Sequence, residues 1–139
     1  MSFWQWYVRR GRIDRRTWWL HYTVPVTALT VLALLADLSV GNVDLAEAAS
    51  GGSFYGPLVV TMLLLTAPPS VSASAARLHD KGLSAWWLLV GLVPYLGGIA
   101  LFVLNGFLRG DGGPNRYGPP AGQALGSPAD PLYVPPSWN

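Results

Sequence analysis

Residues 76–87 hold the side chains whose types and spacing could do chemistry. They place Arg77, His79, Asp80 and Lys81 between two long apolar runs. Histidine and aspartate can transfer protons or bind a metal ion, and the two cations can bind an anion. Each of these chemistries requires partners at a particular spacing, which the sequence can test.

Catalysis and metal binding lack the spacing that they need. His79 and Asp80 are consecutive, so on a helix their side chains diverge and cannot align in a relay with a serine. The only other histidine is His21, and no ligand spacing joins the two imidazoles to Asp14 or Asp80. The chain has no cysteine, which excludes thiolate nucleophiles and cysteine-based metal sites. We therefore predict no enzymatic activity, no metal and no cofactor.

Two interpretations remain for the charged stretch. In the structural one, Arg77 pairs with Asp80 three residues away, Gly82 ends the helix in a left-handed conformation and Ser84 begins the next helix. In the other, basic residues beside a membrane span hold an anion or an anionic lipid headgroup. The candidate site for such a ligand, or for another interaction, consists of Arg12, Arg15, Arg16, Arg77, His79, Asp80 and Lys81.

The composition places the chain in a membrane. Of its 139 residues, 51% are hydrophobic and 12% are charged, whereas a soluble domain has about 25% charged residues. The net charge is only +2, so we expect no nucleic acid as a partner. The apolar composition leads us to expect membrane lipids and other membrane protein subunits. A cluster of five arginines precedes the first apolar run and predicts a cytoplasmic N-terminus: Arg9, Arg10, Arg12, Arg15 and Arg16.

We expect an all-α integral membrane fold with three transmembrane helices, at about residues 18–38, 54–76 and 86–108. Each run has about the 20 apolar residues that cross a bilayer. Tryptophans near the ends of the spans and at the N-terminus suit the membrane–water interface as anchors: Trp4, Trp6, Trp18, Trp19, Trp86 and Trp87.

Prolines and one carboxylate should shape these helices. Asp14 is a plausible N-cap of the first helix, and Pro25 should kink that helix. The prolines at 68 and 69 should interrupt the second helix, and Pro94 should kink the third. The segment 37–53 carries three acidic residues and no basic ones, so we place it outside the cytoplasm.

The third run has two possible paths. A single span leaves Arg109 and Arg116 outside the cytoplasm, whereas a half-depth hairpin turning at residues 94–98 keeps all nine basic residues inside. The charge count slightly favours the hairpin. Length favours the single span, because each hairpin arm would be short and a turn at mid-depth needs protein around it. We predict the single span.

Two terminal segments flank the transmembrane domain, residues 17–109. Residues 1–16 mix aromatic and basic side chains, which fits either an interfacial anchor or a partner-binding segment. Residues 110–139 are rich in proline and glycine and should form an extended tail. In the second span, small residues between Ser70 and Ala76 should pack closely against a neighbour.

Three stretches together resemble a known family: GRIDRRTWW at 11–19, ARLHDKGLSAWWLL at 76–89 and GPNRYGP at 113–119. Over residues 11–119 the chain resembles the DUF805 family, which implies a small integral protein of the bacterial inner membrane and no particular activity. The chain departs from the family pattern in having Thr17 where an acidic residue is common, and in its long tail after Pro119. The family's recurring positions fall here on Gly11, Arg12, Arg15, Trp18, Arg77, Leu78, His79, Asp80, Trp86, Trp87 and on a motif of unknown role, Asn115, Arg116, Tyr117 and Gly118.

These observations predict a small, non-catalytic accessory or structural subunit of the bacterial inner membrane. We expect it to pack on a larger membrane protein assembly through its small-residue helix face and its tail. The alternative is a binding module for an anionic lipid headgroup or a small anion at the cytoplasmic face.

Overall fold

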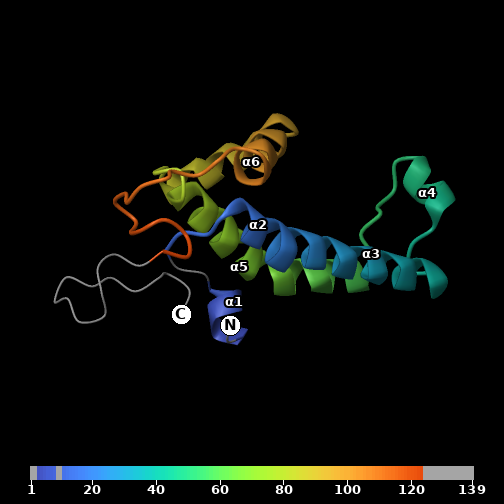
Figure 1. The fold of residues 1–139 in the computed structure, drawn as a ribbon. Helices are drawn as coiled ribbons and strands as arrows, with labels where there is room; N and C mark the ends of the chain where they lie inside the picture. The colour runs from blue at the N-terminus through green and yellow to red at the C-terminus, as the bar shows by residue number, and fades with distance from the viewer. Residues whose placement is uncertain (1–2, 9–10, 124–139) are drawn as a thin grey trace.

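The computed structural model describes residues 3–8 and 11–123, and these residues form helices and connecting loops. Within them, the only strand-like pairing is an isolated bridge between Asn115 and Gly118. In chain order, the helices are α1 (Phe3–Tyr7), α2 (Arg15–Trp18), the π-helix η1 (Trp19–Thr23), α3 (Val24–Ser39), α4 (Leu45–Ala49), α5 (Pro57–His79), the 3₁₀-helix η2 (Ala85–Leu92) and α6 (Leu96–Gly106) (Figure 1).

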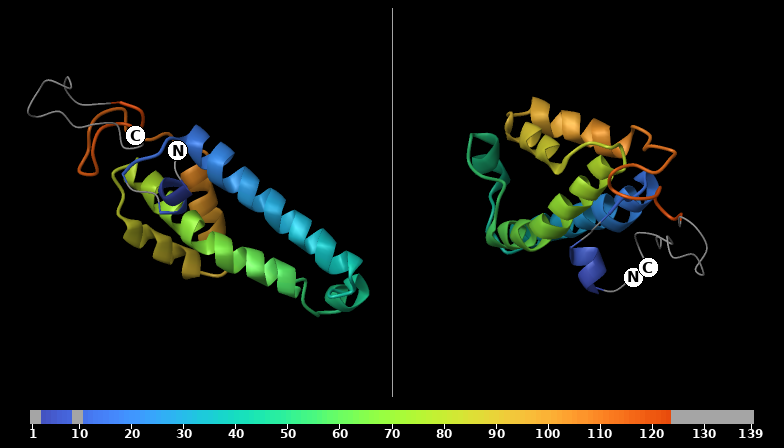
Figure 2. Two further views of the ribbon diagram at one scale, coloured as in Figure 1. Left: turned by 90° about the horizontal axis from the view of Figure 1, so that it is seen from below. Right: turned by 90° about the vertical axis from the view of Figure 1, so that its left-hand side faces the viewer.

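Two long helical rods form the body of the molecule. The first consists of α2, η1 and α3, which continue into one another over Arg15–Ser39, and α5 lies antiparallel beside it (Figures 1 and 2). The rods have 25 and 23 residues, and at about 1.5 Å per residue each exceeds the ~30 Å thickness of a bilayer core. Both are long and apolar enough to cross a membrane, as predicted for the first two runs.

The irregular turn η1 precedes Pro25, where the sequence predicted a disturbance of the first helix. Proline has no N–H to donate to the carbonyl four residues earlier, which is that of His21. The indole Nε1 of Trp6 donates to this carbonyl at 2.7 Å, and its ring stacks on Tyr22 with 5.8 Å between centroids. Helix α1 is therefore docked where the proline leaves a backbone acceptor without its helical donor.

Helix α5 continues through Pro68 and Pro69, so the predicted interruption at these residues is wrong. Helices in membranes tolerate such prolines where neighbouring elements pack around them. The small residues beyond them do find a neighbour, but it belongs to the same chain. Ala73 and Ala76 are buried in a cluster with Trp18 and Tyr22 of the first rod and with Ile13, which precedes that rod.

At the far end of the rods, Asp37 is the buried residue that joins α3 to α5. Its carboxylate accepts hydrogen bonds from the backbone N–H groups of Leu58 (3.2 Å) and Val59 (2.9 Å), at the N-terminus of α5. A helix N-terminus has N–H groups without helical partners, and a carboxylate satisfies them well. The sequence places Asp37 at the end of the first apolar run and at the start of the acidic segment. In the structure it is buried within α3 and caps another helix.

The third apolar run folds back on itself, so the prediction of a single third span is wrong. The run consists of η2 and the 11-residue α6, which pack against each other around a turn at residues 93–95 (Figure 2). Tyr95 has a φ of +61°, in the left-handed region, and a Cβ on Gly97 would collide with the carbonyl of Val90. Helix-breaking Pro94 and close backbone approach at Gly97 thus produce the hairpin that was the alternative.

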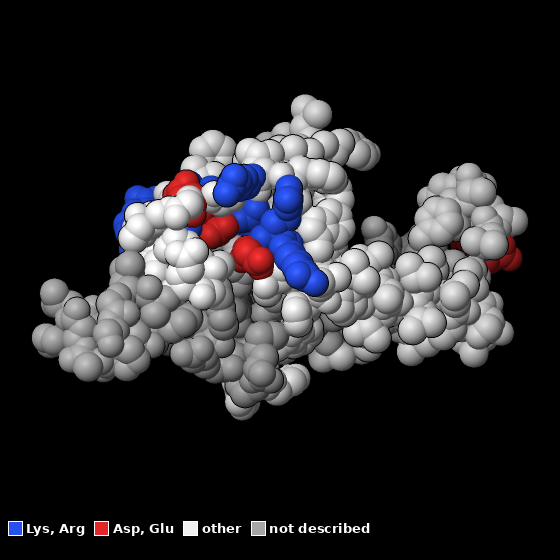
Figure 3. All heavy atoms as spheres, in the orientation of Figure 1, with Lys and Arg blue, Asp and Glu red and all other residues white. Residues whose placement is uncertain are grey.

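The hairpin returns the chain to its starting end, which gathers the described basic residues there. Beyond α6, the N–H of Asp111 donates to the carbonyl of Asp80 at 2.7 Å. Lys and Arg side chains gather at this end of the molecule, whereas acidic side chains of the α4 region lie at the far end (Figure 3). We call the charged end the headpiece; it consists of residues 11–16, 77–84 and 105–118.

The hairpin makes a prediction about sidedness that the natural absence of cysteine makes simple to test. We expect the headpiece to face the cytoplasm, since basic residues stay on that side. In intact cells, a membrane-impermeant maleimide should label Ser50→Cys, beside α4, but label Gly112→Cys only after permeabilisation. Both positions are exposed. Labelling of Gly112→Cys in intact cells together with Ser50→Cys would contradict the hairpin topology.

Candidate functional site

The headpiece is built on one carboxylate between two guanidinium groups. Asp80 follows α5, and its Oδ1 pairs with Arg12 Nε at 3.1 Å while its Oδ2 pairs with Arg77 Nη1. Arg12 and Arg77 are both 0% exposed, and Asp80 is 5% exposed. The predicted pair of Arg77 and Asp80 is confirmed, and Arg12 joins it from 68 residues away.

Backbone carbonyls balance the second positive charge of this triad. Beyond Asp80 Oδ1, Arg12 donates to the carbonyl oxygens of Asp111 (2.6 Å), Gly113 (2.7 Å), Gly118 (3.1 Å) and Asp80 itself (3.4 Å). These make five acceptors, the number of N–H groups that a guanidinium carries. Arg12 thereby fixes the loop after α6 on the end of α5.

Arg77 joins α5 to the end of the hairpin in the same manner. Its Nε donates to the carbonyl of Asn105 at 2.9 Å, and its Nη2 donates to that of Leu108. The last carbonyls of a helix lack helical donors and carry partial negative charge, so a buried cation is favourable there. Asn105 itself is buried within the apolar run.

The motif Asn115–Gly118 is a tight turn that closes over His79. Asn115 Nδ2 donates to the carbonyl of His79 at 3.0 Å, and Arg116 Nη2 donates to that of Gly82 at 3.0 Å. The ring of Tyr117 stacks on the imidazole of His79 at 3.9 Å between centroids. The motif whose role the sequence left unknown therefore anchors the loop to the end of α5.

Two glycines permit the close packing around Asp80. Gly82 has a φ of +67°, and the N–H of Leu83 returns to the carbonyl of Leu78, which confirms the predicted left-handed helix end. A Cβ on Gly110 would overlap Asp80 Oδ2, so only glycine fits there. The predicted caps are present too: Asp14 accepts from the N–H of Thr17, and Ser84 accepts from that of Trp86.

Burial shifts the pKa of the two residues that directly follow α5. It raises the pKa of Asp80, although the charges of Arg77 and Arg12 oppose this. It lowers the pKa of Lys81 to about 8, and the charge of Arg77 adds to the shift. Lys81 Nζ reaches the carbonyl of Arg77 only at 3.4 Å.

The predicted site residues thus separate into two groups. The side chains of Arg12, Arg77 and Asp80 bind one another, and the two arginines also bind backbone carbonyls, so these residues stabilise the fold. Arg15 and Arg16 are exposed at the start of α2, and Arg15 Nη1 donates to the carbonyl of Phe107 at 3.0 Å. Within the described ranges, no group of three or more His, Cys, Asp or Glu residues could hold a metal ion.

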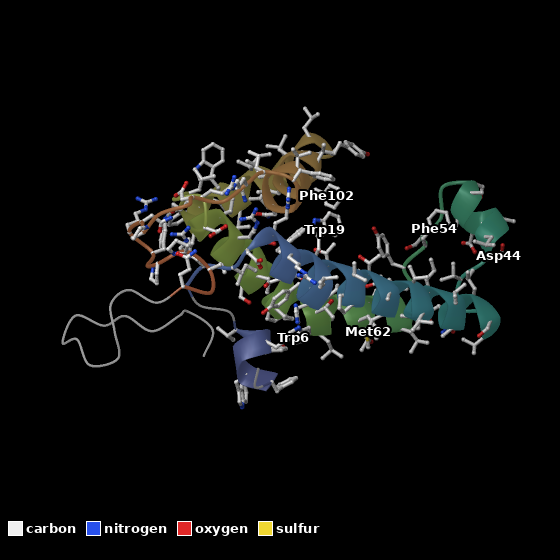
Figure 4. All side chains as sticks on the ribbon, in the orientation of Figure 1. Trp6, Trp19, Asp44, Phe54, Met62 and Phe102 are labelled. Atoms are coloured by element: carbon white, nitrogen blue, oxygen red, sulfur yellow. The ribbon has the colours of Figure 1, made fainter. Side chains whose placement is uncertain are left out.

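The tryptophans also divide between packing and exposure. Trp18 is buried, and Trp19 donates from Nε1 to the carbonyl of Gly106 at 3.0 Å while its ring meets Phe102 edge-on (Figure 4). Trp6 is bound to the His21 carbonyl, as described above. The side chains that remain exposed, and for which the interfacial anchor stays a prediction, are those of Trp4, Trp86 and Trp87.

Sequence reasoning missed several residues of the headpiece. Asn105 gave a signal, because it is a polar residue inside an apolar run, but we did not use it. Gly110 and Asp111 lay in the segment assigned to the tail. Arg109 was assigned to the opposite face of the membrane, whereas it lines one cleft with Arg15 and Arg16.

Comparison of the sequence with known families gives one family match. The family model described as "Protein of unknown function (DUF805)" matches residues 6–119. The chain belongs to the DUF805 family. The match runs from α1 to the turn that closes over His79, so it includes every element of the headpiece.

Two similar proteins come from Escherichia coli, and both carry the name "Inner membrane protein YhaH". One is from strain K12 and the other from O157:H7. Each is 34% identical to the chain over 110 residues, which cover 79% of this chain and 84% of the relative. No solved structure matches the chain significantly.

The shifted lysine gives a pH test of the headpiece. Lys81 is the only lysine of the chain. Its folded pKa of about 8 lies below the ~10.4 of an unfolded lysine, so the unfolded state binds the proton more tightly. This group therefore destabilises the fold below pH ~8, and the penalty disappears as the pH rises from ~8 to ~10.

We expect the melting temperature in detergent to rise from pH 7 to pH 9.5 more for the wild type than for Lys81→Met. Lys81→Met should also melt higher than the wild type at pH 7. Circular dichroism at the two pH values measures both differences. An equal pH dependence of wild type and variant would show that Lys81 is not desolvated.

Proposed function

We propose that the protein is a small, non-catalytic subunit of the bacterial inner membrane that packs on a larger membrane protein assembly. The location is supported by the name of the two relatives, "Inner membrane protein YhaH", and by the two helices that are long and apolar enough to span a bilayer. A non-catalytic role is supported by the headpiece, where Arg12, Arg77 and Asp80 neutralise one another instead of facing a substrate.

The observation that carries the proposal is that the rest of the chain buries only a small part of the two rods. Each rod contains an apolar stretch of 18 residues, and the chain buries 6% of this stretch in the first rod and 22% in the second. Helices in lipid associate through van der Waals packing and polar contacts, and these rods leave most of such surface unused. Leu32 on α3 and Leu64 on α5 are 61% and 70% exposed.

The partner surface differs from the one that the sequence suggested. Ala73 and Ala76, part of the small-residue face, are occupied by the chain's own first rod. The tail from residue 124 onward, the other predicted contact, lies outside the described residues. The proposal therefore assigns the contact to the exposed flanks of α3 and α5.

A second candidate function is the binding of an anionic headgroup, and one feature favours it. A cleft of about 590 Å³ lies beside the triad, with exposed Arg15, Arg16 and Arg109 in its lining. Of the residues in the candidate site, this keeps Arg15 and Arg16, which the triad does not use, and it adds Arg109.

Site-specific photo-crosslinking in cells tests the subunit proposal. A photoreactive amino acid at Leu32 or at Leu64 should give a discrete adduct with another protein, because both side chains face away from the chain's own core. Ala33, the neighbour of Leu32 on α3, is 9% exposed; it provides the matched inward control and should give no adduct. If the two exposed positions yield adducts only with lipid, the chain has no partner on these helices.

A further inference from the structure

The cleft beside the triad and an apolar crevice beneath it together have the form of a lipid site. We propose that Arg15, Arg16 and Arg109 bind the phosphate of an anionic glycerophospholipid whose acyl chain lies along the crevice between the first rod and α6. The inference deepens the headgroup-binding candidate above, and it does not depend on a protein partner.

The three arginines have donors to offer. Arg15 uses Nη1 for the carbonyl of Phe107, and its remaining N–H groups have no partner among the described residues. Arg16 and Arg109 are exposed, and their side chains make no hydrogen bond or ion pair to any residue within 3–8 or 11–123. A guanidinium group can donate two parallel N–H···O hydrogen bonds to a phosphate, which strengthens binding and fixes the orientation of the phosphate.

The carboxylates in the lining do not cancel this charge. Asp80 is held by Arg12 and Arg77, and Asp14 accepts from the N–H of Thr17 at the start of α2. Asp111 accepts from Asn115 Nδ2 at 3.0 Å. Including Arg12, which lies behind Asp80, five arginines face three aspartates, so the neighbourhood keeps an excess of positive charge.

The crevice lies where an acyl chain would follow. It has a volume of about 290 Å³ and lies between the first rod, α5 and α6. Tyr22 is seven residues beyond Arg15 on the same rod, so the crevice is about 10 Å deeper along the helix axis. Most of its surface is apolar, from the rings of Trp18, Tyr22 and Phe102 and from Val26, and two threonines and two serines complete the lining.

The two spaces are bounded by the same pair of elements. Arg15 of α2 and Arg109, three residues after α6, flank the cleft, and Trp18 of the first rod and Phe102 of α6 flank the crevice. The ring of Trp19 meets that of Phe102 edge-on beside the crevice (Figure 4). A ligand that fits both spaces has a phosphate at one end and a hydrocarbon chain at the other.

The test measures lipid binding by the full chain in detergent, by native mass spectrometry with added phosphatidylglycerol or phosphatidylethanolamine. We expect selective retention of phosphatidylglycerol. Because one basic residue contributes about a fivefold factor at an anionic surface, Arg109→Gln should weaken it about fivefold and Arg16→Gln/Arg109→Gln about 30-fold. Arg116→Gln removes the same charge outside the cleft, together with one hydrogen bond to the carbonyl of Gly82, and the folded variant should retain the lipid as the wild type does.

Further measurements distinguish a lipid phosphate from a soluble one and verify that the variants are folded. Soluble glycerol phosphate should bind far more weakly than the lipid, and Ser74→Leu, which keeps every charge but fills the crevice, should reduce lipid retention. Circular dichroism confirms that each variant is folded. Equal losses in Arg116→Gln and Arg109→Gln, no preference for phosphatidylglycerol, or equal affinity for glycerol phosphate would each overturn the inference, whatever the crosslinking experiment shows.

Discussion

One buried carboxylate decides the form of this protein. Asp80 lies between Arg12 and Arg77, which are shielded from solvent and come from segments far apart in the sequence. An exposed ion pair contributes about 0–1 kcal/mol, whereas removing one partner of a buried pair costs about 3–5 kcal/mol. Apart from that of Asp80, the carbonyls that the two guanidiniums bind belong to the end of α6 and the loop after it, so the triad ties three parts of the chain together.

The rest of the architecture follows from this tie. Because α6 must end beside Arg77, the third apolar run returns to the end from which it started, and the headpiece collects the described basic side chains. At the opposite end, Asp37 caps α5 from within α3 and holds the two rods in register. The long rods between these two polar clusters keep their apolar flanks exposed, which is the surface that lipid or a partner would cover.

Local features were predictable from the sequence, and long-range ones were not. The caps at Asp14 and Ser84, the helix end at Gly82 and the pair of Arg77 with Asp80 involve neighbours on one turn, where spacing determines contact. The hairpin was judged by length, and 23 apolar residues fit one crossing as well as two short arms. The role of Arg12 depends on partners 68 to 106 residues away, which no local pattern reveals.

The most direct test of this account is the free energy of unfolding of Asp80→Asn in mixed micelles, measured by titration with sodium dodecyl sulfate. The variant keeps the size of the side chain but leaves Arg12 and Arg77 buried without a counter-charge. We predict a loss of about 3–5 kcal/mol, against at most about 1 kcal/mol for exposed Asp111→Asn. If Asp80→Asn unfolds no more easily than Asp111→Asn, the buried triad is not what holds the headpiece together.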